Sequence, residues 1–236
     1  MKRITLLTDF GTRDGYVAAM KGVIATIAPS VFVEDASHDI PQGDVLSAAQ
    51  ALSRYWHLYP AGTVHVVVVD PGVGTDRAAI ALASQGHFFV GPDNGVFSFI
   101  DDDQAITLTI PADASSTFHG RDVFAPAAAR LSLGEPLHTM GTPLDERFVL
   151  VKEEPRGSVG EVIAIDRFGN IITNIMQAAD VEIQGVEVKL QVAYGDVAEG
   201  ELLALINSDG LLEIALRNGN AAEKLGVTRG MKVQVK

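Results

Sequence analysis

The sequence has no cysteine, few aromatic residues and no cluster of basic residues. The lack of cysteine excludes disulfides, thiolate nucleophiles and cysteine-ligated zinc or iron–sulfur centres. Only 6% of residues are aromatic, so the core must rest on valine, isoleucine, leucine and alanine. The net charge is −12, whereas nucleic-acid binding requires clustered lysine and arginine at the phosphates. We therefore expect no nucleic-acid partner.

Long apolar segments are also missing. The clearest apolar run, Thr63 to Val69, is far too short to span a bilayer. Residues Met1 to Phe10 resemble a strand and lack the apolar region and cleavage site of a secretory signal. We therefore expect a cytoplasmic protein that has no membrane partner.

The first half of the sequence alternates strand-like and helix-like patterns. Short apolar runs at Ile4–Thr8, Val31–Asp35 and Val64–Val69 predict buried strands. Apolar residues recur at helical spacing up to Pro29, and Asp44 is the expected N-cap of a second helix. This alternation predicts an α/β domain with a Rossmann-like, mostly parallel sheet that is covered on both faces.

A charged segment containing proline and glycine, Lys152 to Gly157, interrupts this pattern and is typical of a linker. Beyond it the helical period nearly disappears, and short apolar runs alternate with turns rich in glycine and aspartate. This spacing predicts a smaller antiparallel β-barrel or sandwich. We therefore expect two domains, an α/β domain at residues 1–152 and a β-barrel domain at residues 153–236.

Carboxylates follow two of the predicted strands. Asp9 comes after the first strand, and Asp70 comes directly after the strand that ends at Val69. Ligands of open α/β sheets bind at the carboxyl ends of parallel strands, where a carboxylate can accept hydrogen bonds from a ribose diol. Each aspartate by itself is better explained as the cap of a turn or helix.

Two loops are rich in glycine and charge. The loop from Asp70 to Arg77 has two glycines but matches neither a phosphate loop nor a dinucleotide fingerprint. A second loop contains His119, a residue type whose charge changes near neutral pH. A metal site formed by His119, Asp70 and Asp122 is disfavoured because no typical ligand spacing accompanies them, and we expect no metal. By spacing alone, the sequence predicts an unspecified small-molecule site.

These segments together resemble the adenosine-forming S-adenosyl-L-methionine hydrolases, also called S-adenosylmethionine (SAM) hydroxide adenosyltransferases. Fluorinase and chlorinase are the halogenating relatives of that family. The matching stretches are TDFGTRDGYVAAMKG, DPGVGT with Arg77 following, GPDNGVFS, TFHGRDVFAPAAA, IDRFGNIITNI, and INSDGLLEIA with NGNAA. They span Thr8 to Ala222 and occur in the family order, which makes the combination specific.

The resemblance implies an α/β domain followed by a β-barrel, and a homotrimer whose sites lie between one subunit's first domain and its neighbour's second. The implied reaction is hydrolysis of SAM to adenosine and L-methionine, by attack of water or hydroxide at ribose C5′. SAM is then the substrate, and no cofactor is expected.

In the first domain, the resemblance assigns Asp9 to the ribose hydroxyls and a triad of Asp70, Arg77 and His119 to the attacking water. Asp70 or His119 can accept a proton from water, while Arg77 can orient the triad or stabilise hydroxide character. The sequence does not choose between these two bases.

In the second domain, the resemblance assigns Asp166 and Ser208 to the methionine end and Asn170 to adenine. Glu213 is a weaker candidate for the methionine ammonium. An arginine follows this serine in fluorinase and helps to hold the methionine carboxylate, whereas Asp209 stands here.

Further departures from fluorinase bear on the reaction. Fluorinase has tyrosine, threonine and serine at the positions of Asp70, Val73 and Gly120, and its pocket tryptophan falls at about Gly43. These departures favour hydrolysis. A SAM-dependent halogenase and a non-catalytic nucleoside-binding protein are the alternatives.

Overall fold

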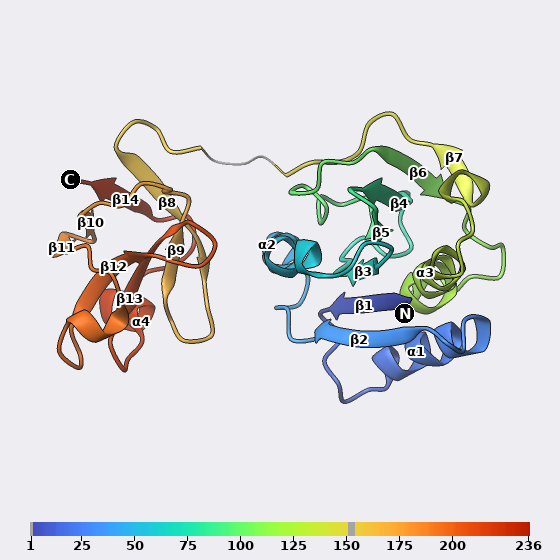
Figure 1. Cartoon of the computed structure of the whole chain (residues 1–236), viewed down its shortest axis with the longest axis horizontal. Helices are drawn as coiled ribbons and strands as arrows, with labels where there is room; N and C mark the ends of the chain where they lie inside the picture. Colours follow the sequence, from blue (N-terminus) through green and yellow to red (C-terminus); the bar gives the residue numbers. More distant parts are fainter. Residues whose placement is uncertain (1, 151–153) are drawn as a thin grey trace. The chain divides into compact units, whose positions relative to one another are not determined.

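The computed structural model describes residues 2–150 and 154–236. Its contacts divide the chain into two compact units, Met1–Leu150 and Val151–Lys236. Each unit has its own sheet (Figure 1), and each has its own buried core. The expected boundary between residues 152 and 153 lies outside the described residues.

The first unit is built on a seven-stranded sheet with the order β2-β1-β3-β5-β4-β6-β7. Its parallel strands are β1 (Arg3–Thr8), β2 (Phe32–Ser37), β3 (Val64–Val68) and β5 (His87–Pro92). Its antiparallel strands are β4 (Ala79–Ser84), β6 (Gln104–Leu108) and β7 (Gly141–Pro143). The predicted α/β class is confirmed, although one edge of the sheet is antiparallel rather than parallel.

The antiparallel edge begins at a tight hairpin between β4 and β5. Ser84 pairs with His87, so only Gln85 and Gly86 form the turn. Both turn residues have positive φ, at 48° and 80°, as a two-residue hairpin of this kind requires. A connection this short cannot return the chain in the parallel direction, which explains the change in strand direction.

Helices cover both faces of the first sheet, as expected. One core contains α1 (Tyr16–Ile27) and α3 (Ala125–Ser132), and the opposite core contains α2 (Val45–Tyr55). Successive residues of β1 such as Leu6 and Leu7 point to opposite cores, as the period of a strand dictates. The predicted N-cap is confirmed, because the Asp44 side chain accepts a hydrogen bond from the amide of Ser47.

Short helical turns complete the unit: η1 (Trp56–Leu58), the π-helical η2 (Gly120–Phe124) and η3 (Leu137–Thr139).

The second unit is an antiparallel sheet with the order β11-β10-β14-β8-β9-β13-β12. Its strands are β8 (Val159–Ile165), β9 (Ile171–Thr173), β10 (Val181–Ile183), β11 (Val186–Val188), β12 (Leu202–Ile206), β13 (Leu212–Leu216) and β14 (Lys232–Val235). A bridge between Leu190 and Ala204 joins the chain after β11 to β12, so the sheet nearly closes on itself. Two short helices lie among the strands, η4 (Tyr194–Asp196) and α4 (Ala221–Leu225). The predicted β-barrel is confirmed.

Candidate active site

The loops that follow β1, β2 and β3 meet at the carboxyl edge of the first sheet. Asp9 follows β1, and its Oδ2 accepts a hydrogen bond of 2.8 Å from the amide of Gly43 in the loop after β2. A Cβ built on Gly43 would lie 3.8 Å from the Cβ of Pro71, which directly follows Asp70. The edge therefore brings Asp9 and the Asp70 loop into the same region.

Asp70, Arg77 and His119 form a single hydrogen-bonded group. Arg77 donates from Nε to Asp70 Oδ1 at 3.0 Å and from Nη2 to Asp70 Oδ2. Arg77 Nη2 also lies 2.9 Å from His119 Nδ1. The side chains of Arg77 and Asp70 are only 9% and 4% exposed, and His119 is buried. The structure thus brings His119 to Arg77, from which it is separated by 42 positions in the sequence.

Arg77 also determines which ring nitrogen of His119 carries the proton. A guanidinium has only donors, so His119 Nδ1 must accept, and the ring proton of a neutral imidazole then lies on Nε2. Burial lowers the pKa of His119, and the positive charge of Arg77 lowers it further, against the opposing effect of Asp70 and Asp122. His119 is therefore neutral near neutral pH and presents an N–H group at Nε2.

Close packing holds the two loops of this group together. The guanidinium of Arg77 lies 5.4 Å from the ring centre of Phe124, whose edge contacts the ring of His119. Gly74 has a φ of +78°, and a Cβ there would lie 2.4 Å from the carbonyl oxygen of Ser116. Only glycine permits this approach of the Asp70–Arg77 loop to the segment before His119.

An aromatic cluster adjoins the same residues. Phe10 follows Asp9 and Phe118 precedes His119, and their ring centres are 6.0 Å apart. Tyr16 packs against Phe118 at 5.2 Å and is half exposed. The sequence analysis did not select these rings, although Phe10 and Phe118 are neighbours of two selected residues. The cluster gives this edge of the sheet an apolar, partly exposed face.

In the second unit, Asp166 organises the turn after β8. Its Oδ1 accepts from the amides of Phe168 and Asn170 at 2.8 and 2.9 Å, and its Oδ2 accepts from Asn170 Nδ2 at 3.0 Å. Gly169, with a φ of +82°, lies so close to Asn220 that a Cβ would meet that side chain at 2.0 Å. The Asp166–Asn170 turn is therefore locked against the loop before α4.

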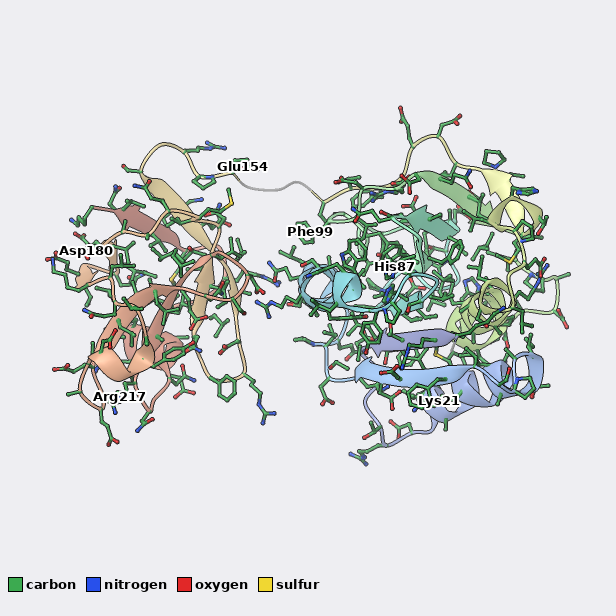
Figure 2. All side chains as sticks on the ribbon, in the orientation of Figure 1. Lys21, His87, Phe99, Glu154, Asp180 and Arg217 are labelled. Atoms are coloured by element: carbon green, nitrogen blue, oxygen red, sulfur yellow. The ribbon has the colours of Figure 1, made fainter. Side chains whose placement is uncertain are left out.

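A cavity of about 620 Å³ opens beside this turn. It is lined by Phe168, Asn170, Tyr194, Gly195, Leu216, Arg217, Asn218 and Gly219; the labelled Arg217 can be found at the edge of the second unit in Figure 2. Sequence reasoning selected Asn170 but missed Phe168 and Tyr194. The signal for Phe168 was its place inside a conspicuous glycine–asparagine turn, whereas Tyr194 has no such context.

Glu213 connects this cavity to the turn that carries Ser208. Glu213 is buried, and its Oε1 accepts a 2.6 Å hydrogen bond from the hydroxyl of Tyr194. Its Oε2 accepts from Asn207 Nδ2 at 3.4 Å, and Ser208 follows in the exposed tip of that turn. Burial and the charge of Glu213 raise the pKa of Tyr194, so its hydroxyl remains a donor. All four candidates of the second unit thus belong to one connected region.

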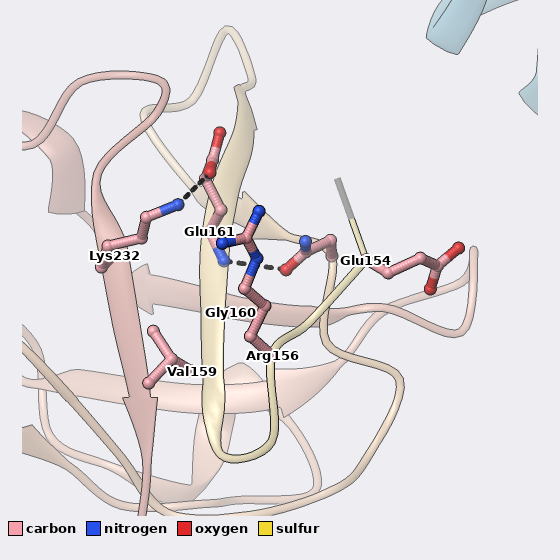
Figure 3. Close-up of a pocket in the computed structure, with 7 residues that line it drawn as sticks. Glu154, Arg156, Val159, Gly160, Glu161 and Lys232 are labelled. Atoms are coloured by element: carbon pink, nitrogen blue, oxygen red, sulfur yellow. Dashed lines mark hydrogen bonds and ion pairs between the residues drawn. The ribbon is translucent and has the colours of Figure 1, made fainter. Parts of the chain in front are cut away.

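A smaller cavity of about 280 Å³ lies at the start of the second unit (Figure 3). It is lined by Glu154, Arg156, Val159, Gly160, Glu161, Asn174 and Lys232. Lys232 forms an ion pair with Glu161, whose amide donates to Asn174 Oδ1 at 2.8 Å. None of the predicted site residues lines this cavity.

In residues 2–150 and 154–236, no group of three or more histidine, aspartate or glutamate side chains is arranged to hold a metal ion. Within the same residues, no helix is both long enough and apolar enough to cross a membrane.

The fold and these residues define a two-unit protein with a buried Asp–Arg–His group at a sheet edge and a ligand-sized cavity in its β-barrel. Residues 4–141 match the model of the SAM hydroxide adenosyltransferase N-terminal domain, and residues 160–234 match that of the C-terminal domain. The chain belongs to the SAM hydroxide adenosyltransferase family.

Known proteins are similar to this chain over nearly its full length. An (R)-S-adenosyl-L-methionine hydrolase of Thermus thermophilus is 40% identical, with 100% of both chains covered. The protein of the same name from Salinispora tropica is 41% identical over 98% of this chain and 97% of its own. A fluorinase of an Actinoplanes species is 26% identical over 98% and 96%. A solved structure of an uncharacterized conserved protein from Thermotoga maritima has a TM-score of 0.90 at 35% identity, covering 98% and 99%.

Proposed function

We propose that this chain hydrolyses S-adenosyl-L-methionine to adenosine and L-methionine. The buried Asp70–Arg77–His119 group is the structural observation that carries the proposal, because it places a donor and a carboxylate together at a ligand-binding edge. Family membership and the hydrolase names of relatives at about 40% identity support it. The substrate supplies its own leaving group, so the chemistry requires neither a cofactor nor a metal.

The reaction is a substitution at the ribose C5′ carbon. The oxygen of water forms a bond to C5′ while the C5′–S bond breaks, and its electron pair passes to sulfur. The sulfonium becomes the neutral thioether of methionine, and the water loses one proton. The enzyme must mainly hold the water in line with the C5′–S bond and restrict other water.

The triad geometry suggests distinct roles for its members. Because His119 Nδ1 already accepts from Arg77, we assign its Nε2–H as a donor that orients the attacking water. Asp70 is then the acceptor of the water proton, since each carboxylate oxygen retains a lone pair beyond its bond to Arg77. Arg77 fixes both groups and stabilises negative charge that develops on the oxygen.

We assign binding of the remaining substrate groups to residues of both units. Asp9 binds the ribose hydroxyls, and Asn170 binds adenine beside the rings of Phe168 and Tyr194. The methionine end is held by a second set in the β-barrel, consisting of Asp166, Ser208 and Glu213. Asp209 carries the wrong charge for the methionine carboxylate, so we assign no contact to it.

We further propose a cytoplasmic homotrimer of two-domain subunits, with the boundary between residues 152 and 153. Each site would combine the first domain of one subunit with the second domain of its neighbour. The assignment of ligand groups to both domains and the family membership support this arrangement. Mixing tests it: an inactive Asp70→Asn variant is unfolded and refolded together with a second-unit variant in which Asp166, Asn170 and Glu213 are all replaced by alanine, so that it no longer binds SAM. Shared sites restore part of the activity, whereas sites within one chain leave the mixture inactive.

Product analysis tests the function itself. Wild-type protein incubated with SAM should release adenosine and methionine in equal amounts, and H₂¹⁸O should label the adenosine at its 5′ oxygen. A mainly halogenated nucleoside in the presence of chloride or fluoride would instead establish a halogenase. Tight adenosine binding without turnover over hours would establish a non-catalytic binding protein.

The sulfonium sulfur is a stereocentre, and the names of the hydrolase relatives specify its R configuration. We extend the proposal to that epimer. Separated epimers in the same assay should show faster turnover of the R form. Faster turnover of the S form would overturn only this stereochemical part.

A further inference from the structure

The Gly91–Gly95 turn is linked to both ends of the Asp70–Arg77 loop. Asn94 Nδ2 donates a 2.9 Å hydrogen bond to the carbonyl of Val69, the residue before Asp70. The amide of Asp93 donates, also at 2.9 Å, to the carbonyl of Ala78, the residue after Arg77. Two neighbouring residues of one turn thus bond to the backbone at the two ends of the Asp70–Arg77 loop.

The Asn94 contact occurs where regular strand pairing has ended. The register between β3 and β5 ends at the pair Val66–Val90, three residues before Val69. Beyond that point the Asn94 side-chain amide, rather than a backbone N–H of β5, donates to the carbonyl of Val69 directly after β3. The orientation of this amide is fixed, because its Oδ1 accepts from the amide of Val96 at 3.2 Å.

The turn itself is anchored from the opposite side. Asp93 Oδ1 accepts from the amide of Phe148 at 2.9 Å, and Ser98 Oγ accepts from the amide of Leu150 at 2.7 Å. A Cβ on Gly95 would lie 2.6 Å from the Leu150 side chain, so the segment packs directly onto the turn. The position of Asn94 is therefore set by contacts that do not involve the loop it holds.

We propose that Asn94 is a positioning residue for the Asp70–Arg77 pair. The proposal rests on the hydrolase function proposed above. Asn94 acts through the Val69 carbonyl, which fixes where the backbone delivers the Asp70 carboxylate. Because in-line attack tolerates little displacement, a shift of about 1 Å in the carboxylate is expected to cost on the order of 100-fold in rate.

Two variants of Asn94 and one matched control test this role. Asn94→Asp keeps the shape and the acceptor for Val96 but loses the donor to Val69, and Asn94→Ala loses both. Ser84→Ala, at the last residue of β4, removes a buried hydroxyl that donates to the Asp101 carbonyl and is bonded neither to the turn nor to the Asp70–Arg77 loop. Steady-state kinetics with SAM, the Kd for adenosine and thermal midpoints are measured for all three.

Both Asn94 variants should lower kcat by about ten- to a hundredfold, while KM and the Kd for adenosine change less than about threefold. Ser84→Ala should lose thermal stability yet keep kcat within about threefold of wild type. Equal kcat in Asn94→Asp and wild type would overturn the proposal, as would an equal loss of kcat in Ser84→Ala. If wild-type protein releases no adenosine, the proposed function fails instead, and that result is distinct from either outcome.

Discussion

The two units hold their candidate residues in opposite ways. In the first unit, Asp70, Arg77 and His119 bond to one another and are almost completely buried. In the second unit, Asp166 bonds mainly to the backbone of its own turn, beside a cavity whose Phe168 is 70% exposed. We therefore expect the first arrangement to serve the chemical step and the second to serve substrate binding.

The difference has a physical basis. A buried ion pair needs nearly ideal geometry to offset its desolvation, so Asp70 and Arg77 tolerate little movement. The bonds of Arg77 to Asp70 and His119 hold these groups in place, which lowers the reorganisation that a transition state would require. The Asp166 carboxylate, by contrast, accepts its hydrogen bonds from the residues of its own turn. Changes in the first unit should therefore reduce turnover, and changes in the second should reduce affinity.

The largest expected effect follows from breaking the buried group. His119→Ala and Asp70→Asn should lower kcat by about two to four decades, the usual contribution of a positioned acid–base group. The affinity for adenosine should change much less, because neither residue is assigned to the nucleoside. Kinetics and calorimetric titration measure the two effects separately. Full turnover in either variant would remove that residue from the mechanism.

A smaller effect is expected when the two loops of the group are pushed apart. Gly74→Ala places a Cβ 2.4 Å from the Ser116 carbonyl at a φ of +78°, where alanine is strained by about 1–2 kcal/mol. The variant should lose stability and about ten- to a hundredfold in kcat. Gly11→Ala is the matched control, with φ +62° but nothing within 4 Å of the new Cβ. If both variants lose the same turnover, the close approach to Ser116 is not the cause.

In the second unit, the loss should appear in affinity. Asn170→Ala removes a side chain that lines the larger cavity, and one neutral hydrogen bond contributes about 0.5–1.5 kcal/mol. The Kd for adenosine should therefore rise about two- to twelvefold, while kcat at saturating SAM stays nearly unchanged. Asn174→Ala, in the smaller cavity, controls for general loosening of the barrel. A loss confined to kcat would contradict the division of roles between the two units.

The smallest expected effect is on the folding stability of the first unit at acid pH. All six histidines lie in the first unit; among them, His65 and His87 are buried and stacked, with Nε2 and Nδ1 3.2 Å apart (His87 is labelled in Figure 2). Burial lowers the pKa of His65 to about 3, and burial also lowers that of His87.

The sign of the pH effect follows from these shifts. Between pH 6.5 and about 3, the unfolded chain binds protons at His65 that the folded unit excludes, so stability falls as pH falls. Each such histidine contributes up to about 1.4 kcal/mol per pH unit. Urea unfolding from pH 7 to 5 should show this slope in wild type and a shallower slope in His87→Gln. Identical slopes would show that His87 does not couple folding to pH.

The sequence predicted the α/β unit, the β-barrel and the Asp44 cap, because each depends on local periodicity or a single side chain. It did not predict the antiparallel edge, since the apolar runs of β4 and β5 look alike in either direction. Among the site residues, the family motifs indicated Asp70, Arg77 and His119, yet their pattern left the choice of base open. The boundary, the trimer and the roles of all site residues remain predictions.

The sequence by itself determined which residue types stand at the ends of strands and in tight turns, since glycine, aspartate and asparagine impose local geometry. Only the tertiary structure decided which atoms of these residues meet. The Arg77 donor at His119 Nδ1, the Tyr194 hydroxyl on Glu213 and the Asn94 amide on the Val69 carbonyl each join separate segments. Such contacts depend on how layers pack and how closely loops approach, which no local pattern specifies. Hydrogen-bond direction, and with it the protonation state of a buried histidine, is fixed only at that level.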